Sequence, residues 1–166
     1  ALVLLAQGSE EMEAVISIDV LRRGGIDVTV AGVDGAAPIR CSRGVVVTPD
    51  VALDEVEGNF DVVVLPGGAE GAQRLAASAK VGEILRKQEK SGRWVGAICA
   101  APIALQAHRV FQNRQLTSHP SVKEMLEDWL TTDLRHFSYP YGMKRHFPDA
   151  LMDYCWEIGC ATVSTG

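Results

Sequence analysis

Four strand-like segments alternate along this chain with segments of helical character, and this alternation constrains the fold more than any other feature of the sequence. The strand-like segments are Leu2–Ala6, Val28–Ala31, Asp61–Leu65 and Trp94–Ile98. The helical segments are Glu10–Gly24, Glu70–Ala77, Val81–Ser91 and Ala101–His108. Strands that alternate with helices predict a parallel sheet, and strands that are apolar on both sides fit burial between two helical layers. The sequence therefore predicts a three-layer, doubly wound α/β sandwich.

Three weaker segments extend this pattern. Val45–Thr48 is expected to add a further strand, and Leu116–Ser118 a short strand that precedes a helix over Pro120–Trp129. Proline is favoured at the first position of a helix, which places the start of that helix at Pro120.

The βα rhythm stops after Trp129. Residues 130–166 have no clean hydrophobic period and offer at most one short strand, at Ala161–Ser164. We therefore expect an α/β domain over residues 1–129 and an atypical carboxyl-terminal segment of the same domain over residues 130–166.

Composition and net charge limit the kinds of binding partner and environment that we expect for this chain. The chain has 166 residues, enough for one domain with its own core, and 47% of them are hydrophobic. Its formal net charge of −5 gives no electrostatic reason to expect a nucleic acid or an anionic membrane as partner. Its apolar runs are too short to span a bilayer. The four cysteines form no C-x-x-C pair, so we expect free thiols and a cytoplasmic, reducing environment.

Cys99 is the first candidate for chemistry. It stands where the strand-like segment Trp94–Ile98 runs into the small-residue turn before Pro102, a position resembling a nucleophile elbow. If the thiol lies at a helix N-terminus, unpaired N–H groups and the helix dipole favour the thiolate and lower the thiol pKa. An inert buried cysteine is the alternative, because free cysteines are often buried.

Glu13 is the second candidate. On the helix that begins after Ser9 it shares a face with Ile16, Ser17 and Val20, which aims a carboxyl toward the buried side. Burial raises a carboxyl pKa, and a protonated acid can donate a hydrogen bond to a thiolate or exchange a proton with substrate. A partly solvated surface residue is the alternative. The acids before it, Glu10 and Glu11, are explained by the helix dipole.

Further groups are expected at the same end of the sheet, outside the carboxyl ends of the strands. Gly67 and Gly68 follow a strand, where their N–H groups can form an oxyanion hole or simply a tight turn. His119 is a candidate base or a helix cap. Arg43 is a candidate for binding an anion near the site; the alternative is a solvated surface charge.

No cofactor or metal is expected. The chain has neither a G-x-G-x-x-G loop nor a P-loop lysine motif. Cys155, Cys160, His136 and His146 do not have the spacing of a zinc site.

Residues 1 to about 129 resemble the Parkinson-disease protein deglycase family, the DJ-one proteins of the PfpI-type superfamily. The resemblance is carried by the motifs ALVLLA at residues 1–6, GSEEME at 8–13, DVVVLPGG at 61–68, AICAAP at 97–102 and TSHP at 117–120. It implies a flavodoxin-like fold of the class I glutamine-amidotransferase type.

The resemblance also implies roles for single residues. Cys99 matches the nucleophilic and oxidation-sensing cysteine, Glu13 the carboxyl that hydrogen-bonds it, and His119 the nearby histidine. The residues implied as donors or as basic groups near the pocket are Gly68, Ala100, Arg23 and Arg43.

The activities implied are those of a cofactor-free glyoxalase or protein deglycase. The expected substrates are methylglyoxal, glyoxal and early glycation adducts on proteins or nucleotides. Oxidative-stress sensing through Cys99, chaperone action and dimerisation through the first helix are also implied, as is a cytoplasmic, nuclear or mitochondrial location. A noncatalytic redox sensor or chaperone is the main alternative.

Two related enzyme classes fit the motifs less well. PfpI-type cysteine peptidases place a histidine directly after the nucleophile, where this chain has Ala100. Glutamine amidotransferases use a His-x-Glu pair, whereas His119 is followed by Pro120 and Ser121. The family's further strands, Gly-Pro-Gly-Thr turn and closing helix are not visible after Trp129, which suggests an alternative exon or a changed reading frame.

Overall fold

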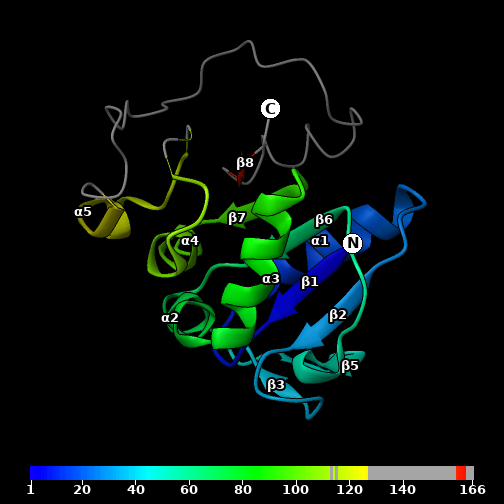
Figure 1. Ribbon diagram of the computed structural model, residues 1–166. Helices are drawn as coiled ribbons and strands as arrows, with labels where there is room; N and C mark the ends of the chain where they lie inside the picture. The colour runs from blue at the N-terminus through cyan, green and yellow to red at the C-terminus, as the bar shows by residue number, and fades with distance from the viewer. Residues whose placement is uncertain (113, 115, 127–159, 164–166) are drawn as a thin grey trace.

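A sheet of six strands organises the computed structural model, which describes residues 1–112, 114, 116–126 and 160–163 (Figure 1). Five strands are parallel, and the sixth, β8, pairs antiparallel with β7. In spatial order the strands are β5 (Val51–Ala52), β2 (Thr29–Gly32), β1 (Leu2–Leu5), β6 (Val62–Leu65), β7 (Trp94–Ile98) and β8 (Cys160–Val163). The predicted mostly parallel α/β sandwich is therefore confirmed.

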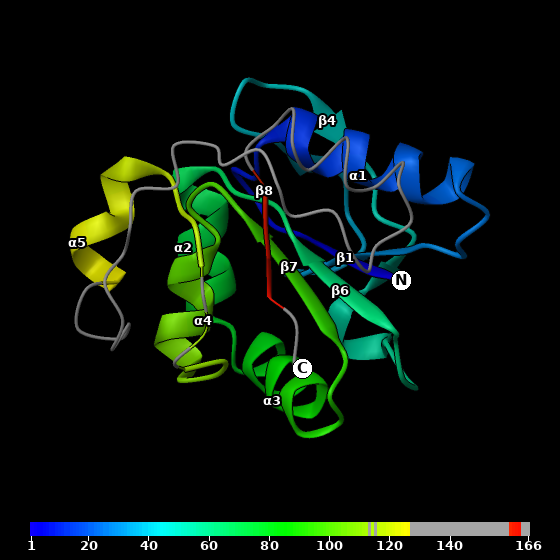
Figure 2. The ribbon, with the colours of Figure 1, turned by 90° about the horizontal axis from the view of Figure 1, so that it is seen from above.

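Helices cover both faces of the sheet, as Figure 2 shows. One face carries α1 (Glu11–Arg23), and the other carries α2 (Ala69–Ala77), α3 (Ala79–Lys90) and α4 (Pro102–His108). Alternate residues of β1 enter the two cores: Leu2 and Leu4 pack under α2–α4, while Val3 and Leu5 pack under α1. All four side chains are fully buried, and each such burial contributes about 1.5–3 kcal/mol.

The predicted helices and main strands agree with the structure to within one or two residues. The strand expected at Val45–Thr48 exists as β4 (Val46–Val47), but it pairs with β3 (Ile39–Arg40) in a separate antiparallel hairpin and does not join the main sheet. The strand expected near Ala161 is confirmed as β8. Both segments are short, so their sequences alone do not specify which strand each one pairs with in the folded chain.

The strand predicted at Leu116–Ser118 is wrong. This segment has no strand structure, and the amide of His119, directly after it, donates to Cys99 O at 2.8 Å. One such bond does not make a ladder. The helix predicted from Pro120 begins as a 3-10 turn, η2 (Pro120–Val122), and continues as α5 (Lys123–Leu126).

Residues 127–129 of that predicted helix lie outside the described residues, as does most of the segment 130–166. The proposed division at residue 129 therefore stays a prediction.

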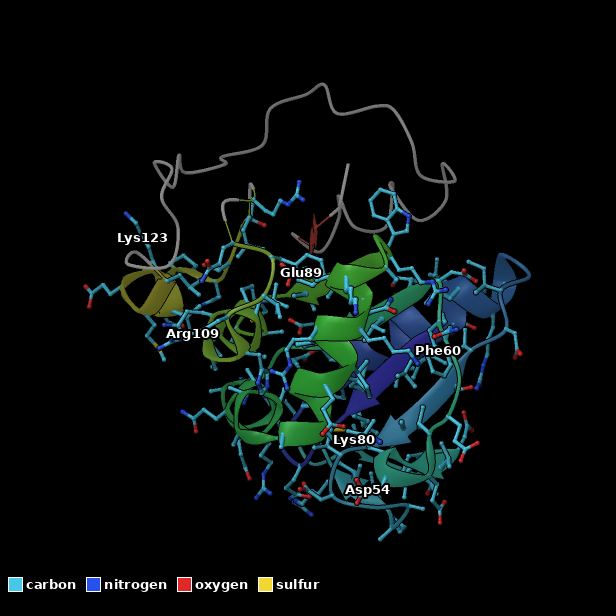
Figure 3. The ribbon with its side chains drawn as sticks, in the orientation of Figure 1. Asp54, Phe60, Lys80, Glu89, Arg109 and Lys123 are labelled. Carbon is cyan, nitrogen blue, oxygen red and sulfur yellow. The ribbon has the colours of Figure 1, made fainter. Side chains whose placement is uncertain are left out.

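The segment after α4 is fixed before it reaches His119. Arg109 ends α4 in a left-handed conformation, and Glu89 of α3 accepts a hydrogen bond from the amide of Phe111; Figure 3 labels both charged side chains. Phe111 itself is fully buried. These contacts hold the chain against α3 and lead it back across the end of β7.

The strand order places a switch point between β1 and β6. The chain leaves β1 toward β2 on one side, while β6 lies on the other side of β1. In doubly wound sheets, the carboxyl ends of strands at such a point form the usual ligand crevice. Here they carry the N-terminus of α1, the Gly67–Gly68 turn and, one strand further, Cys99.

Candidate active site

Cys99 is held in a sharp turn directly after β7. Its φ of 60° lies in the left-handed region, which costs a non-glycine residue on the order of 1–2 kcal/mol. The Ala101 amide donates to Ile98 O at 2.9 Å and closes the turn around the cysteine. The helix α4 begins at Pro102, within one residue of the predicted start at Ala101, and Cys99 lies in the turn just before it. The amides that act on the thiol are those of Gly68 and Ala100, which lie outside α4.

The Cys99 thiol is half-buried and has polar partners from three directions. The amides of Gly68 and Ala100 donate hydrogen bonds to it, and the Glu13 carboxyl shares a hydrogen bond with it. The amides favour the thiolate because they stabilise negative charge on sulfur. The structure thus brings together four of the residues that the sequence singled out.

Glu13 reaches this thiol from the first turn of α1. Its Oε2 accepts a hydrogen bond from the Gly67 amide at 2.7 Å. The fully buried stripe of α1 runs through Ala14 and Leu21, and Glu13 lies beside it at a half-buried position. The predicted inward carboxyl is therefore present, at the margin of the core.

Burial raises the pKa of Glu13, and the charge of Glu10 raises it further, while the Gly67 amide acts in the opposite direction. Burial likewise raises the pKa of the Cys99 thiol, as does a negative charge on Glu13. The lowered thiol pKa expected from the sequence is therefore wrong, because burial and then the charge of Glu13 outweigh the amides of Gly68 and Ala100. The Cys99 thiol, as a hydrogen-bond donor to the Glu13 carboxylate, lowers the pKa of Glu13 in return. A proton held on Glu13 removes the repulsion and supplies a donor to the thiolate.

Glycine is required at both positions of the turn after β6. A Cβ on Gly67 would lie 2.7 Å from Cys99 Cβ and 2.7 Å from Glu13 Oε2. Gly68 has a φ of 84°, and a Cβ there would lie 2.7 Å from the amide nitrogen of Glu10. The turn can approach the thiol and the carboxyl this closely because it carries no side chains.

His119 is close to the site through its backbone and its charge. Its amide donates to Cys99 O at 2.8 Å, and its ring acts on the pKa of Glu13, lowering it. The exposed ring also caps η2, because Nδ1 accepts from the Ser121 amide at 3.2 Å. The capping role considered from the sequence is therefore present.

The two arginines are not beside the thiol in the described contacts. Arg23 is exposed at the far end of α1, about 15 Å along the helix from Glu13, and pairs with Asp19 at 2.6 Å. Arg43 is exposed in the turn after β3, and its amide donates to Glu11 Oε1 at 2.8 Å.

Glu11 has a role that the sequence did not reveal. It is 7% exposed, and its carboxylate accepts hydrogen bonds from Ser42 Oγ at 2.8 Å and from the amide of Arg43. Burial alone raises its pKa, but these hydrogen bonds outweigh burial and hold the pKa below its ordinary value. A first-turn acid that only faces the helix dipole would be solvated. Nothing in the local sequence distinguishes the two cases.

The other described thiol, Cys41, is buried, and burial raises its pKa. Across residues 1–112, 114, 116–126 and 160–163, no group of three or more His, Cys, Asp or Glu side chains is arranged to hold a metal ion. Within the same residues, no helix has both the length and the apolar character needed to cross a bilayer.

Known proteins are similar to this chain in sequence and in fold. Residues 1–134 match the model of the DJ-1/PfpI family. Protein DJ-1alpha of Drosophila melanogaster is 52% identical over 130 residues, which make up 77% of this chain and 60% of that protein. The glutathione-independent glyoxalase DJR-1.2 of Caenorhabditis elegans is 42% identical over 130 residues, or 77% of this chain and 68% of that protein.

The crystal structure of Drosophila melanogaster DJ-1beta superposes with a TM-score of 0.74 at 52% identity, covering 75% of this chain and 68% of that one. The chain thus spans about two thirds or less of the length of these relatives.

Proposed function

Because this chain belongs to the DJ-1/PfpI family, we propose that it is a cofactor-free, glutathione-independent glyoxalase in which Cys99 attacks small aldehydes. The observation that carries the proposal is the hydrogen-bonded pair of Cys99 and Glu13, with the Gly68 and Ala100 amides on the sulfur. A nucleophile beside a group that can hold and release a proton is what aldehyde addition requires. The relative named as a glutathione-independent glyoxalase supports the choice of substrate class.

The first step is addition of the thiolate to the aldehyde carbon of methylglyoxal. A C–S bond forms, and the carbonyl electron pair moves onto oxygen, which takes the proton from Glu13 to give a hemithioacetal. The amides of Gly68 and Ala100 hold the thiolate before attack, and Glu13 lies within reach because Gly67 fixes its carboxyl. Glu13 acts as the general acid in this step.

The second step moves a proton between neighbouring carbons. The Glu13 carboxylate removes the hydrogen from the sulfur-bearing carbon, an enediol forms, and the proton returns to the adjacent carbon. The product is a hydroxyacyl thioester, in which one carbon has been oxidised and its neighbour reduced. Water then cleaves the C–S bond, releases lactate and regenerates the thiol, so the net reaction is addition of one water to methylglyoxal.

His119 is the alternative proton carrier. Its charge acts on Glu13, and its ring is exposed at the mouth of the turn, which suits exchange of protons with solvent. Early glycation adducts hold the aldehyde as a hemiaminal or hemithioacetal, which breaks down to the free aldehyde and the amine or thiol of the protein or nucleotide. The proposed deglycase activity is attack by Cys99 on the aldehyde so released.

A redox sensor is the second candidate function. A half-buried thiol with two amide donors is open to hydroperoxides as well as to aldehydes, and its thiolate form is the one they oxidise. Both functions use Cys99, but only the enzyme needs a proton carrier.

We also propose that the protein forms a homodimer through α1 and β4. The exposed large apolar side chains here are Met12 and Val15 of α1, Val46 of β4 and Val45 directly before β4. The two elements lie side by side in Figure 2, and Val45 N donates to Glu11 of α1 at 3.5 Å. Exposed apolar side chains on neighbouring elements favour burial against a second copy.

Glu13→Gln tests the enzymatic proposal. The amide side chain keeps an acceptor for the Gly67 amide but cannot carry the proton, so lactate formation from methylglyoxal without glutathione should fall at least about a hundredfold. Glu83→Gln, the same change at an exposed acid of α3, serves as the control. Unchanged turnover in Glu13→Gln contradicts the mechanism. Turnover absent from the wild type, with hydroperoxide oxidation of Cys99 retained, favours the sensor.

A further inference from the structure

A closed set of three hydrogen bonds joins the N-terminus of α1 to the turn after β6. The Glu13 amide donates to Glu10 Oε2 at 2.8 Å. The Glu10 amide donates to Gly67 O at 3.0 Å, and the Gly67 amide donates to Glu13 Oε2 at 2.7 Å. Each of the three residues therefore donates to one of the other two and accepts from the remaining one.

This arrangement is an enlarged capping box. In the ordinary box, the N-cap side chain accepts from the amide three residues later, and the side chain at that position accepts from the N-cap amide. Here the Glu10 side chain accepts from the Glu13 amide, as in the ordinary box. The Glu13 carboxyl does not accept directly from the Glu10 amide, because the peptide groups of Gly67 lie between them and bond to both.

The enlarged box ties helix capping to the position of a single carboxyl. Glu13 contributes its amide to the cap and its side chain to Gly67, so its backbone and carboxyl are both fixed. The same carboxyl is hydrogen-bonded to the Cys99 thiol. No side chain can be added at Gly67 without meeting Glu13 and Cys99, so the box closes directly against the nucleophile.

We propose that Glu10 is a positioning residue of this site: its carboxylate, through the amide of Glu13 and the peptide of Gly67, holds the Glu13 carboxyl against the Cys99 thiol. The inference rests on the proposed function, since it concerns the same pair of groups. Glu10 touches neither the thiol nor the reacting atoms in any described contact and acts through Glu13.

The groups that face the Glu13 carboxyl are Glu10 on its own helix, Cys99 after β7 and His119 before η2. The negative charge of Glu10 also acts on Glu13, so loss of that charge and loss of the hydrogen bond need to be separated. Glu10→Gln removes the charge but keeps an acceptor oxygen for the Glu13 amide. Glu10→Ala removes both.

The test compares these two variants in the whole chain by the pH profile of Cys99 alkylation with iodoacetamide, counted by mass spectrometry at that cysteine. We expect Glu10→Ala to show an apparent thiol pKa at least about half a unit lower than Glu10→Gln, and alkylation about threefold faster near neutral pH. The reason is that a loosened Glu13 carboxylate no longer accepts from the thiol or opposes its ionisation.

Ser78→Ala is the matched control. Ser78 caps α3 by accepting from the Val81 amide at 3.4 Å, far along the chain from the site. Its loss should lower the melting temperature, as Glu10→Ala does, but leave the alkylation profile unchanged. If Glu10→Ala and Glu10→Gln share one profile, or if both keep the wild-type profile, the positioning role is refuted.

Alkylation does not depend on turnover. A chain that fails to convert methylglyoxal but separates the two variants retains the positioning role while losing the proposed function.

Discussion

The amide of Gly67 donates to Oε2 of Glu13 at 2.7 Å, and the space that a Cβ on Gly67 would occupy lies 2.7 Å from that same oxygen. Cys99 Cβ stands at the same distance from that space. Residues after β1, β6 and β7 thus meet so closely that only a residue without a side chain fits between them. The pairing of acid and thiol depends on this approach.

Gly67→Ala should therefore disturb the site and the fold together. The added methyl group meets Ile98 O at 2.9 Å as well, and overpacking of this kind costs about 1–3 kcal/mol. We expect a lower urea midpoint and loss of most methylglyoxal turnover. Gly96→Ala is the control, because among the side chains that the structure describes a Cβ at Gly96 meets Val64 alone, at 3.9 Å. Equal losses in both variants would mean that the close approach at Gly67 has no special role.

Glu13 should make the wild type less stable as the pH rises. Burial, and then the charge of Glu10, raise its folded-state pKa. A carboxyl with a raised folded pKa contributes its full stability below the unfolded pKa of about 4.3, and this is lost as the pH rises through the folded pKa. The glutamine of Glu13→Gln does not ionise. The melting temperature of this variant should therefore rise relative to that of the wild type as the pH increases from about 4 to neutrality. A difference that is constant with pH contradicts the raised pKa.

Glu11 should have the opposite dependence. Although burial acts against ionisation, the hydrogen bonds from Ser42, Arg43 and Val45 hold its pKa below the ordinary value. Its contribution is therefore present above the unfolded pKa of about 4.3 and is lost as the pH falls through the folded pKa. We expect the wild type to exceed Glu11→Gln in urea midpoint at neutral pH and this advantage to shrink in acid. If the stability advantage of the wild type instead grows as the pH falls, the lowered pKa of Glu11 is contradicted.

Self-association should depend on the exposed face of α1 and β4. Met12 is 65% exposed on α1, and Met125 is 53% exposed on α5. Met12→Glu places a charge on the proposed interface. Sedimentation should then give a dimer dissociation constant at least about tenfold higher than that of the wild type, equivalent to about 1.4 kcal/mol of association free energy. Met125→Glu should leave association unchanged. A monomeric wild type, or equal effects of both changes, contradicts the proposed interface.

Much of this arrangement could be predicted because it follows from strand order. Cys99, Gly67 and the start of α1 each follow an apolar strand, and the carboxyl ends of parallel strands meet at one edge. Helical periodicity also indicated that Glu13 turns inward. These are consequences of local pattern and of a common topology.

The rest depends on contacts that no local pattern specifies. Glu10 and Glu11 look like ordinary first-turn acids, yet one completes a box with Gly67 and the other holds the turn at Ser42. Leu116–Ser118 has the residues of a strand but no ladder partner. The thiol pKa is raised and not lowered because burial, and then the charge of Glu13, oppose ionisation, and neither contact is visible in the local sequence.

The central claim is that Cys99 attacks the aldehyde. Its most direct test is lactate formation from methylglyoxal without glutathione, measured for the wild type and for Cys99→Ser after circular dichroism has shown both to be folded. The account predicts lactate from the wild type and a loss of at least about a thousandfold with serine, whose hydroxyl is a far weaker nucleophile than a thiolate. Equal lactate from both proteins, or none from the folded wild type, would contradict it.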